Sequence, residues 1–126
     1  MGCLRCEVKD CLDALCEGTG VLEADDGDFE VYLGSHPVWV RCDQRTRSVM
    51  LFRVLATGVS YEDALAAAIN GFNARTTVFR SFFEDGCIVL RADLSGCPLT
   101  MIHLQDVLES FEEQAGALDR AISEES

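Results

Sequence analysis

The 126-residue sequence predicts an α+β fold: a single domain, residues 1–126, with an antiparallel meander sheet and helices packed on one face. Three segments carry apolar residues at intervals of three and four, which is the helical period. Other segments alternate or are apolar throughout, and turn signals separate them. With 48% apolar residues, a chain of this length can bury one core. The expected element order is α-β-β-β-α-β-β-α.

The first half of the chain supplies one helix and the first strands. A helix is expected over residues 3–17, and Gly18-Thr19-Gly20 should end it. The segment "VLEADDGDFEVYL" predicts a weak hairpin around Asp26-Gly27, without indicating which arm pairs in the sheet. "PVWVRC" alternates as a strand, and "SVMLFRVLA" is apolar on both faces apart from Arg53, which favours a central strand. The apolar stripe of the helix is Leu4, Val8, Cys11, Leu12 and Leu15.

The second half supplies a helix, a hairpin and a final helix. Ser60 and Asp63 have the spacing of a capping box, so a helix is expected from there to about Asn73. "TTVFRSFF" and "CIVLRAD" predict two strands joined through "EDG". A long amphipathic helix then begins near Pro98 and Thr100. Its predicted stripe is Met101, Leu104, Leu108, Phe111, Ala115, Leu118 and Ile122.

Four cysteines between residues 3 and 16 raise the question of a metal or redox site. In a helix, Cys3 and Cys16 would lie about 20 Å apart along the axis. Zinc holds its ligand sulfurs at about 2.3 Å, so one helix cannot bring all four to one ion. We interpret these cysteines as small side chains on and beside the core-facing stripe, and we expect no metal and no cofactor. The alternative is a terminal metal or redox pair of Cys3 and Cys6 with a thiol- or metal-responsive regulatory role.

Charge and composition exclude several function classes. The formal net charge of −12 argues against nucleic acid and anionic membrane surfaces as partners. The sequence has no apolar run long enough to span a membrane and no secretory signal, so we expect a cytoplasmic protein. His36 and His103 have no nucleophile at motif spacing, and no phosphate-binding glycine loop is present. We therefore predict no catalytic residues and a protein that is not an enzyme.

Side-chain alternation divides the predicted sheet into two unlike faces. One face carries no charge and is expected to be the core. The other combines arginines with aromatic and aliphatic residues, a composition typical of protein interfaces. The alternative for this second face is an outer surface whose arginines lie over apolar neighbours and pair with acids. The expected core face is Val38, Val40, Cys42, Met50, Phe52, Val54, Thr77, Phe79, Ser81, Phe83, Ile88, Leu90 and Ala92. The expected partner-binding residues are Trp39, Arg41, Leu51, Arg53, Arg80, Phe82 and Arg91.

A longer pattern connects the second half of the chain to a known family. The "N…N" helix end at Asn70 and Asn73 precedes a strand with Arg80 and the hairpin turn Asp85-Gly86. A "DL…PL" loop follows, and the helical stripe closes the pattern. Over roughly Val38 to Ile122, the sequence resembles the type III secretion chaperone fold and its YbjN-like relatives. The further residues of the pattern are Asp93, Leu94, Pro98, Leu99, Leu104, Leu108 and Phe111.

The resemblance implies a small cytosolic homodimer that binds extended or helical peptide segments of a client protein. No catalytic residue of the family is carried over, and the cysteine-rich first helix departs from the family pattern. We expect the four arginines Arg41, Arg53, Arg80 and Arg91 to lie side by side on the helix-free side of the sheet. Acids from a second chain or from a client should then offset their charge.

Overall fold

The structure, a computed structural model, describes residues 3–16, 21–33, 36–96 and 98–125. The Gly18–Gly20 helix stop and Cys97 lie outside this part of the chain. The helices are α1 (Leu4–Leu15), α2 (Asp63–Arg75) and α3 (Met101–Glu125). The strands are β1 (Val21–Glu23), β2 (Phe29–Leu33), β3 (His36–Asp43), β4 (Ser48–Ala56), β5 (Phe79–Glu84) and β6 (Cys87–Ser95).

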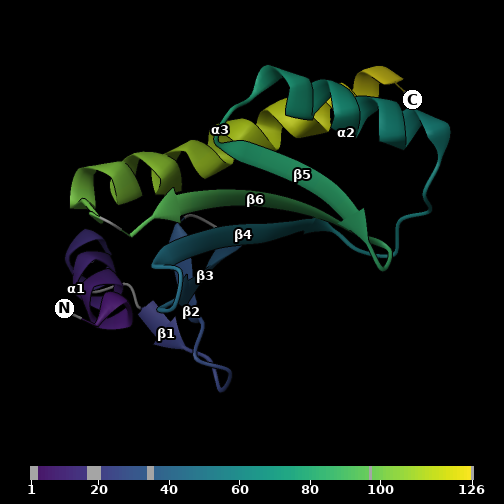
Figure 1. Cartoon of the computed structure of the whole chain (residues 1–126). Helices are drawn as coiled ribbons and strands as arrows, with labels where there is room; N and C mark the ends of the chain where they lie inside the picture. Colours follow the sequence, from purple (N-terminus) through teal and green to yellow (C-terminus); the bar gives the residue numbers. More distant parts are fainter. Residues whose placement is uncertain (1–2, 17–20, 34–35, 97, 126) are drawn as a thin grey trace.

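The six strands form one antiparallel sheet in the order β1-β2-β3-β4-β6-β5. The predicted α+β meander is confirmed, with one strand more than expected because both arms of the 21–33 hairpin pair. Figure 1 shows a strongly twisted sheet, with α2 and α3 side by side along β5 and β6 and α1 beside the β1–β3 end. The turn Asp85-Gly86 has positive φ at both residues, 51° and 77°, as a two-residue hairpin turn requires.

The helices bury most of the stripes that the sequence predicts, but Met101 is 44% exposed, so its place in the α3 stripe was wrong, and Cys11, Leu15 and Ile122 are only partly buried. In α1, the buried side chains are Leu4, Val8 and Leu12. Cys16, which the helical spacing placed off the stripe, is also buried, because the chain leaves helical geometry there and turns it into the core. In α3, the stripe is buried from Leu104 to Leu118, and Thr100 Oγ1 caps the helix by accepting from the N–H of His103 at 3.2 Å.

Two details of α2 and β5 differ from the prediction. The helix begins at Asp63, and Glu62 occupies the N-cap position without a side-chain cap bond, so the expected Ser60 cap was wrong. Tyr61 lies outside the helix, exposed, with its ring 5.1 Å from that of Phe83. The helix continues to Arg75, and β5 begins only at Phe79.

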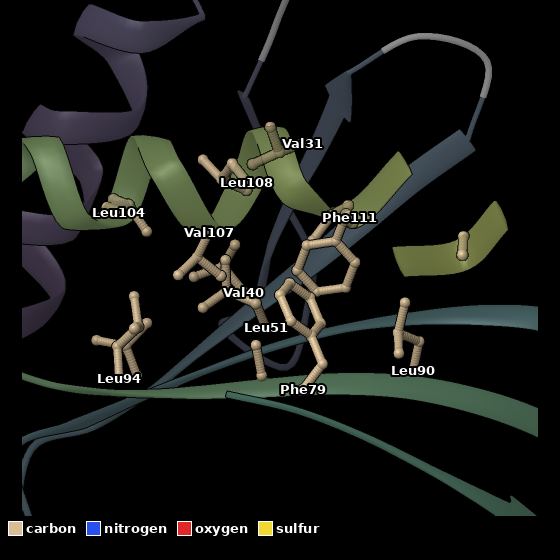
Figure 2. Close-up of a cluster of buried hydrophobic side chains, with 14 of the residues drawn as sticks. Val31, Val40, Leu51, Phe79, Leu90, Leu94, Leu104, Val107, Leu108 and Phe111 are labelled. Atoms are coloured by element: carbon tan, nitrogen blue, oxygen red, sulfur yellow. The ribbon is translucent and has the colours of Figure 1, made fainter. Parts of the chain in front are cut away.

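The core lies between the three helices and one face of the sheet. Figure 2 shows Leu104, Val107, Leu108 and Phe111 of α3 over Val40, Leu51, Leu90 and Leu94 of the strands. Phe79 and Phe111 meet edge to face, with centroids 5.0 Å apart. None of the helices in the described ranges has both the length and the apolar character needed to cross a membrane.

The first turn of α1 is fixed to the β3–β4 turn. The N–H of Leu4 donates to Gln44 Oε1 at 2.7 Å, and Glu7 pairs with Arg47 at 2.8 Å. Gly96 allows the close approach, because a Cβ there would lie 2.7 Å from Leu4 Cδ1 and 2.8 Å from the Arg47 carbonyl oxygen. The start of α1 is therefore an integral part of the fold.

Candidate functional site

The central strand β4 lies in the register opposite to the one expected. Val40 pairs with Leu51 and Trp39 pairs with Phe52, so odd-numbered residues of β4 share the face of even-numbered residues of β3. Val49 and Leu51 are consequently buried against the helices. The residues expected in the core from β4, which are Met50, Phe52 and Val54, lie on the helix-free face. The predicted faces of β3, β5 and β6 are correct.

Arg53 is the clearest correction among the predicted site residues. Its side chain is only 3% exposed and lies on the helix-covered face, where Nη1 pairs with Glu112 Oε1 of α3 at 2.9 Å. The guanidinium carbon also lies 6.0 Å from the Phe111 ring centroid. Leu51 is fully buried on the same face. Arg53 and Leu51 therefore stabilise the contact between the sheet and α3 and do not belong to the helix-free surface.

Arg41, Arg80 and Arg91 lie on strand positions of the helix-free face, and each of them already has a partner within this chain. Arg41 forms a bidentate pair with the buried carboxylate of Asp28, at 2.8 Å for the closest atoms. Arg91 pairs with Asp93 of its own strand at 3.0 Å. The expectation that a second chain offsets these charges is wrong for both.

Arg80 is engaged differently. Its Nη1 donates to the carbonyl oxygens of Thr76 at 2.7 Å and Phe79 at 2.9 Å, so the guanidinium lies at the carboxyl end of α2. A cation there meets the partial negative charge of the helix end. By register Arg80 is beside Arg91, yet its charged group is directed toward α2.

A groove of about 430 Å³ runs over the helix-free face. We call this surface the groove and define it by its lining residues. Its floor is apolar, and the ring of Phe52 lies 5.5 Å from the guanidinium carbon of Arg41. Of the predicted partner-binding residues, Arg41, Phe82 and Arg91 line it, while Trp39 lies half-buried on the same face outside the lining. The lining residues are Arg41, Met50, Phe52, Val54, Phe82, Glu84, Asp85, Cys87, Val89 and Arg91.

The two ends of the groove differ in charge. At one end, Arg41 and Arg91 are offset by their own acids. At the other end, the β5–β6 turn carries Glu84 and Asp85, both exposed, and neither forms an ion pair with any residue that the structure describes. The groove therefore presents an apolar floor and one end with unmatched negative charge.

The β5 edge of the sheet is closed at its centre by Asn73 of α2. The side-chain amide donates to the Ser81 carbonyl oxygen at 2.9 Å, and its oxygen accepts from the Ser81 N–H at 2.7 Å. The Asn73 amide thus satisfies the two backbone groups of Ser81, which an added strand would otherwise use at the centre of this edge. The sequence pattern had marked Asn73 only as part of a helix end. The other edge strand, β1, has three residues.

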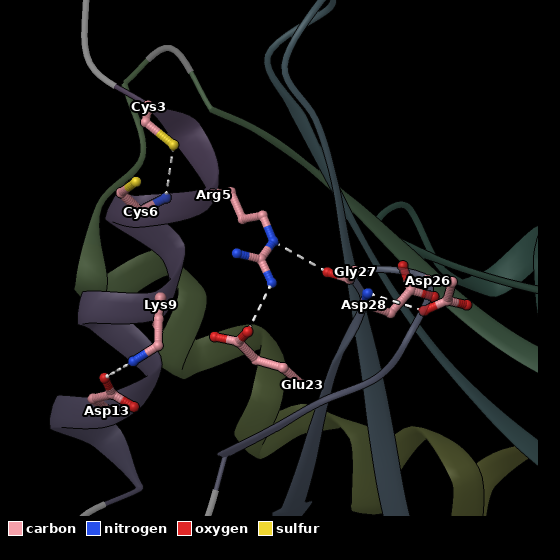
Figure 3. A network of polar contacts seen from close by, with 9 residues as sticks. All are labelled: Cys3, Arg5, Cys6, Lys9, Asp13, Glu23, Asp26, Gly27 and Asp28. Carbon is pink, nitrogen blue, oxygen red and sulfur yellow. Dashed lines mark hydrogen bonds and ion pairs between the residues drawn. The ribbon is translucent and has the colours of Figure 1, made fainter.

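The opening cysteines belong to the docked end of α1. Cys3 is the N-cap, and its Sγ accepts from the Cys6 N–H at 3.3 Å (Figure 3). The hydrogen bond between the Cys3 and Cys6 side chains lowers the pKa of the Cys3 thiol, and the Cys6 N–H acts in the same direction. The same side-chain hydrogen bond, followed by burial, raises the pKa of the Cys6 thiol. Among the described residues no group of three or more metal-ligating side chains is placed to hold an ion.

Next to Cys3 and Cys6, the guanidinium carbon of Arg5 lies 4.5 Å from the Phe29 ring centroid, and Arg5 pairs with Glu23 at 3.3 Å. These two contacts connect α1 to β1 and β2.

Sequence reasoning missed the β4 residues of the groove and its acidic end. The sequence feature that could have identified the β4 residues is the length of the connection between β3 and β4. Asp43 and Ser48 close a four-residue turn, and counting outward from this pair places Met50, Phe52 and Val54 on the face of Arg41.

Comparisons with known proteins agree with this architecture. A search of solved structures finds the HopA1–SchA chaperone–effector complex at a TM-score of 0.68 and 15% identity, covering 92% of this chain and 94% of that one. The Yersinia pestis type III secretion chaperone SycH, solved with a fragment of YscM2, has a TM-score of 0.67 and 14% identity over 92% of this chain and 99% of that one.

YbjN from E. coli, described as a putative transcription regulator, has a TM-score of 0.68 and 16% identity over 94% of this chain and 90% of that one. At these identities the likeness shows a shared fold. No curated protein matches the chain in sequence. The family model described as T3SS (YopN, CesT) and YbjN peptide-binding chaperone 1 matches residues 3–126. The chain therefore belongs to the family of T3SS (YopN, CesT) and YbjN peptide-binding chaperones.

Proposed function

We propose that this chain is a non-enzymatic, chaperone-like or adaptor domain that binds protein or peptide clients on the helix-free face of its sheet. Residues 1–126 act as one domain, and we place the activity in the cytoplasm. Family membership supports a peptide-binding role. The solved relatives include a chaperone–effector complex and a chaperone bound to a fragment of another protein, which is the kind of partner proposed here.

The observation that carries the proposal is the groove. Its apolar floor is uncovered by any described helix, whereas the opposite face of the same sheet is buried under three. Large apolar side chains collected in a hollow are typical of a surface that is covered in a complex. The ion pairs at Arg41 and Arg91 hold two long side chains at its rim before a client arrives, which lowers the entropy cost of binding.

We propose that the chain acts as a homodimer in which the groove remains open to the client. A dimer is the arrangement that the family resemblance implies. If the groove is reserved for the client, a change in its floor alters client binding and leaves the subunit contact intact. Sedimentation velocity of the wild type and of Phe52→Ser should therefore give the mass of two chains for both. A monomeric Phe52→Ser protein would identify the groove as the subunit interface.

Selection from a display library of random 15-residue peptides tests the binding function. The wild type should enrich peptides, and their affinity should fall at least tenfold for Phe52→Ser. Ile102→Ser is the matched control, because this side chain is 74% exposed at the start of α3, away from the groove. Circular dichroism establishes that both variants are folded. No enrichment by the wild type, or equal binding by Phe52→Ser and the wild type, would refute the proposal.

A further inference from the structure

Cys3 and Cys6 are the two exposed thiols among the cysteines that the structure describes. Cys3 is the N-cap of α1, and its carbonyl oxygen accepts from the Glu7 N–H at 3.1 Å, so the helical backbone spacing begins at this residue. Three residues along a helix advance about 4.5 Å and turn by about 300°, which places the two Cα atoms about 5 Å apart. A disulfide joins residues whose Cα atoms lie about 4.4–6.8 Å apart, so this backbone is already within the range for a bond between the two sulfurs.

The other neighbouring cysteines of α1 are too far apart to be joined. Cys6 and Cys11, and likewise Cys11 and Cys16, are five residues apart, which in a helix separates their Cα atoms by about 9 Å. This distance exceeds the limit of about 7 Å for a disulfide without backbone movement. Cys42 is close enough to Cys3 for an electrostatic interaction, but burial raises the pKa of Cys42 to about 11 and keeps it protonated at neutral pH. Among the described cysteines, Cys6 is therefore the favoured partner of Cys3.

The contacts of this first turn hold the two thiols together. Cys3 Sγ accepts from the Cys6 N–H at 3.3 Å (Figure 3). The hydrogen bond with the Cys6 side chain lowers the pKa of the Cys3 thiol, which increases the fraction of thiolate, the form that attacks a disulfide. The hydrogen bond and the ion pair that fix the start of α1 to the β3–β4 turn keep both cysteines in this arrangement.

We propose that Cys3 and Cys6 form a reversible disulfide by exchange with a low-molecular-weight disulfide such as oxidised glutathione. The Cys3 thiolate attacks one sulfur of the small disulfide, whose S–S bond breaks, and one thiolate leaves. Cys6 then gives its proton to water and attacks the Cys3 sulfur of the mixed disulfide, which expels the second thiolate. The two protein thiols are oxidised, and their two electrons and two protons convert the small disulfide into two thiols.

Trypsin cleaves after Arg5 and so separates the two cysteines. The peptide that ends at Arg5 and the peptide of residues 6–9 remain joined only if a disulfide links them. The folded wild type should be equilibrated with mixtures of oxidised and reduced glutathione, its remaining thiols blocked with N-ethylmaleimide, and the digest analysed by mass spectrometry without reduction. We expect the joined peptides in the oxidising mixture and their loss in the reducing one. Cys11→Ser, which alters a half-buried cysteine of the same helix, is the matched control and should give the same joined peptides.

Serine variants test the order of the two attacks. Cys6→Ser retains a hydroxyl group beside Cys3 and should stop at the mixed disulfide, with one glutathione on Cys3. Cys3→Ser keeps a favourable N-cap residue, so the helix should persist, as circular dichroism can verify. Its glutathione adduct on Cys6 should form about threefold more slowly or less, because the higher pKa of Cys6 leaves a smaller thiolate fraction at pH 7.

Three results would overturn the proposal. They are glutathione adducts on the wild type without the joined peptides, linkage of the peptide that ends at Arg5 to the peptide that contains Cys42, and equal rates of adduct formation in the two serine variants. Each of these results leaves peptide binding standing, because α1 packs on the face of the sheet opposite to the groove. Failure of peptide selection would in turn leave the disulfide standing.

Discussion

The position of Arg53 gives the sharpest stability prediction. Its side chain is 3% exposed and paired with Glu112, whose side chain is 59% exposed. Replacing Arg53 by Glu places a carboxylate in the core beside a second carboxylate. Replacing it by Met keeps an unbranched side chain against Phe111 and frees Glu112 to return to water.

The two changes should differ widely in free energy of unfolding. Breaking a buried pair so that a charge is left uncompensated costs about 3–5 kcal/mol, and we expect about 3 for Arg53→Glu because Glu112 is partly solvated. Arg53→Met should stay within about 1.5 kcal/mol of the wild type, since the volume is nearly conserved and the lost pair is half in water. With a urea m-value of about 1–3 kcal/mol/M, the loss in Arg53→Glu lowers the midpoint by roughly 1–3 M.

Urea unfolding followed by circular dichroism at 222 nm measures both midpoints. Arg91→Glu is the control, because the Arg91 side chain is 42% exposed on the helix-free face and its replacement should cost less than about 1 kcal/mol. Equal midpoints for Arg53→Glu and Arg91→Glu would refute the placement of Arg53 and, with it, the register of β4.

Three further predictions concern single side chains. Asn73→Ala should cost about 1–3 kcal/mol in urea unfolding, since it leaves the Ser81 N–H and carbonyl without their partner, and light scattering should reveal concentration-dependent association through the opened edge. Unchanged stability and scattering would contradict that role. Asp28→Asn removes the buried acid of Arg41 and should cost about 1–3 kcal/mol at pH 7, and a loss below 0.5 kcal/mol would count against the pair. Burial raises the pKa of the Cys42 thiol to about 11, above its ordinary value of 9.0, so its contribution to stability is complete below pH 9 and is lost toward pH 11. The stability of the wild type should therefore fall more steeply over that range than that of Cys42→Val, and parallel curves would show that Cys42 is solvated.

Local patterns were sufficient for the elements that pack through one unambiguous face. The stripe of α3 is apolar at every third or fourth position, and the Asp85-Gly86 turn requires left-handed backbone that few sequences supply. Apolar and polar side chains alternate along both β5 and β6 outward from that turn, so the face on which each side chain lies could be predicted correctly.

The face of β4 could not be predicted from its own residues, because the strand is apolar at both parities. Its one charge was assigned to the outside, where an arginine usually lies. In the fold, that rule yields to pairing: the four-residue turn from Asp43 to Ser48 fixes the register, and Glu112 compensates the buried cation. This error of one residue in the assumed register of β4 placed Arg53 and Leu51 in the predicted site. It left out Phe52 and its neighbours Met50 and Val54, which line the groove.

The acidic end of the groove and the role of Asn73 depend on tertiary structure. Glu84 and Asp85 were recognised as a turn, but only the pairing of β5 with β6 brings them to the end of an apolar floor. Asn73 reaches Ser81 across a loop, and a helix-end pattern carries no information about a strand edge.

The central claim is that a client segment binds on the helix-free face of the sheet. Methionine methyl groups report on it directly, because Met50 lies in the groove while Met101, 44% exposed, begins α3. A ¹³C-methyl-methionine spectrum should be recorded with and without a peptide selected by the wild type, with Met50→Leu used for assignment. We expect the Met50 resonance to shift on binding and the Met101 resonance to stay in place; a shift of Met101 with Met50 unmoved would contradict the account.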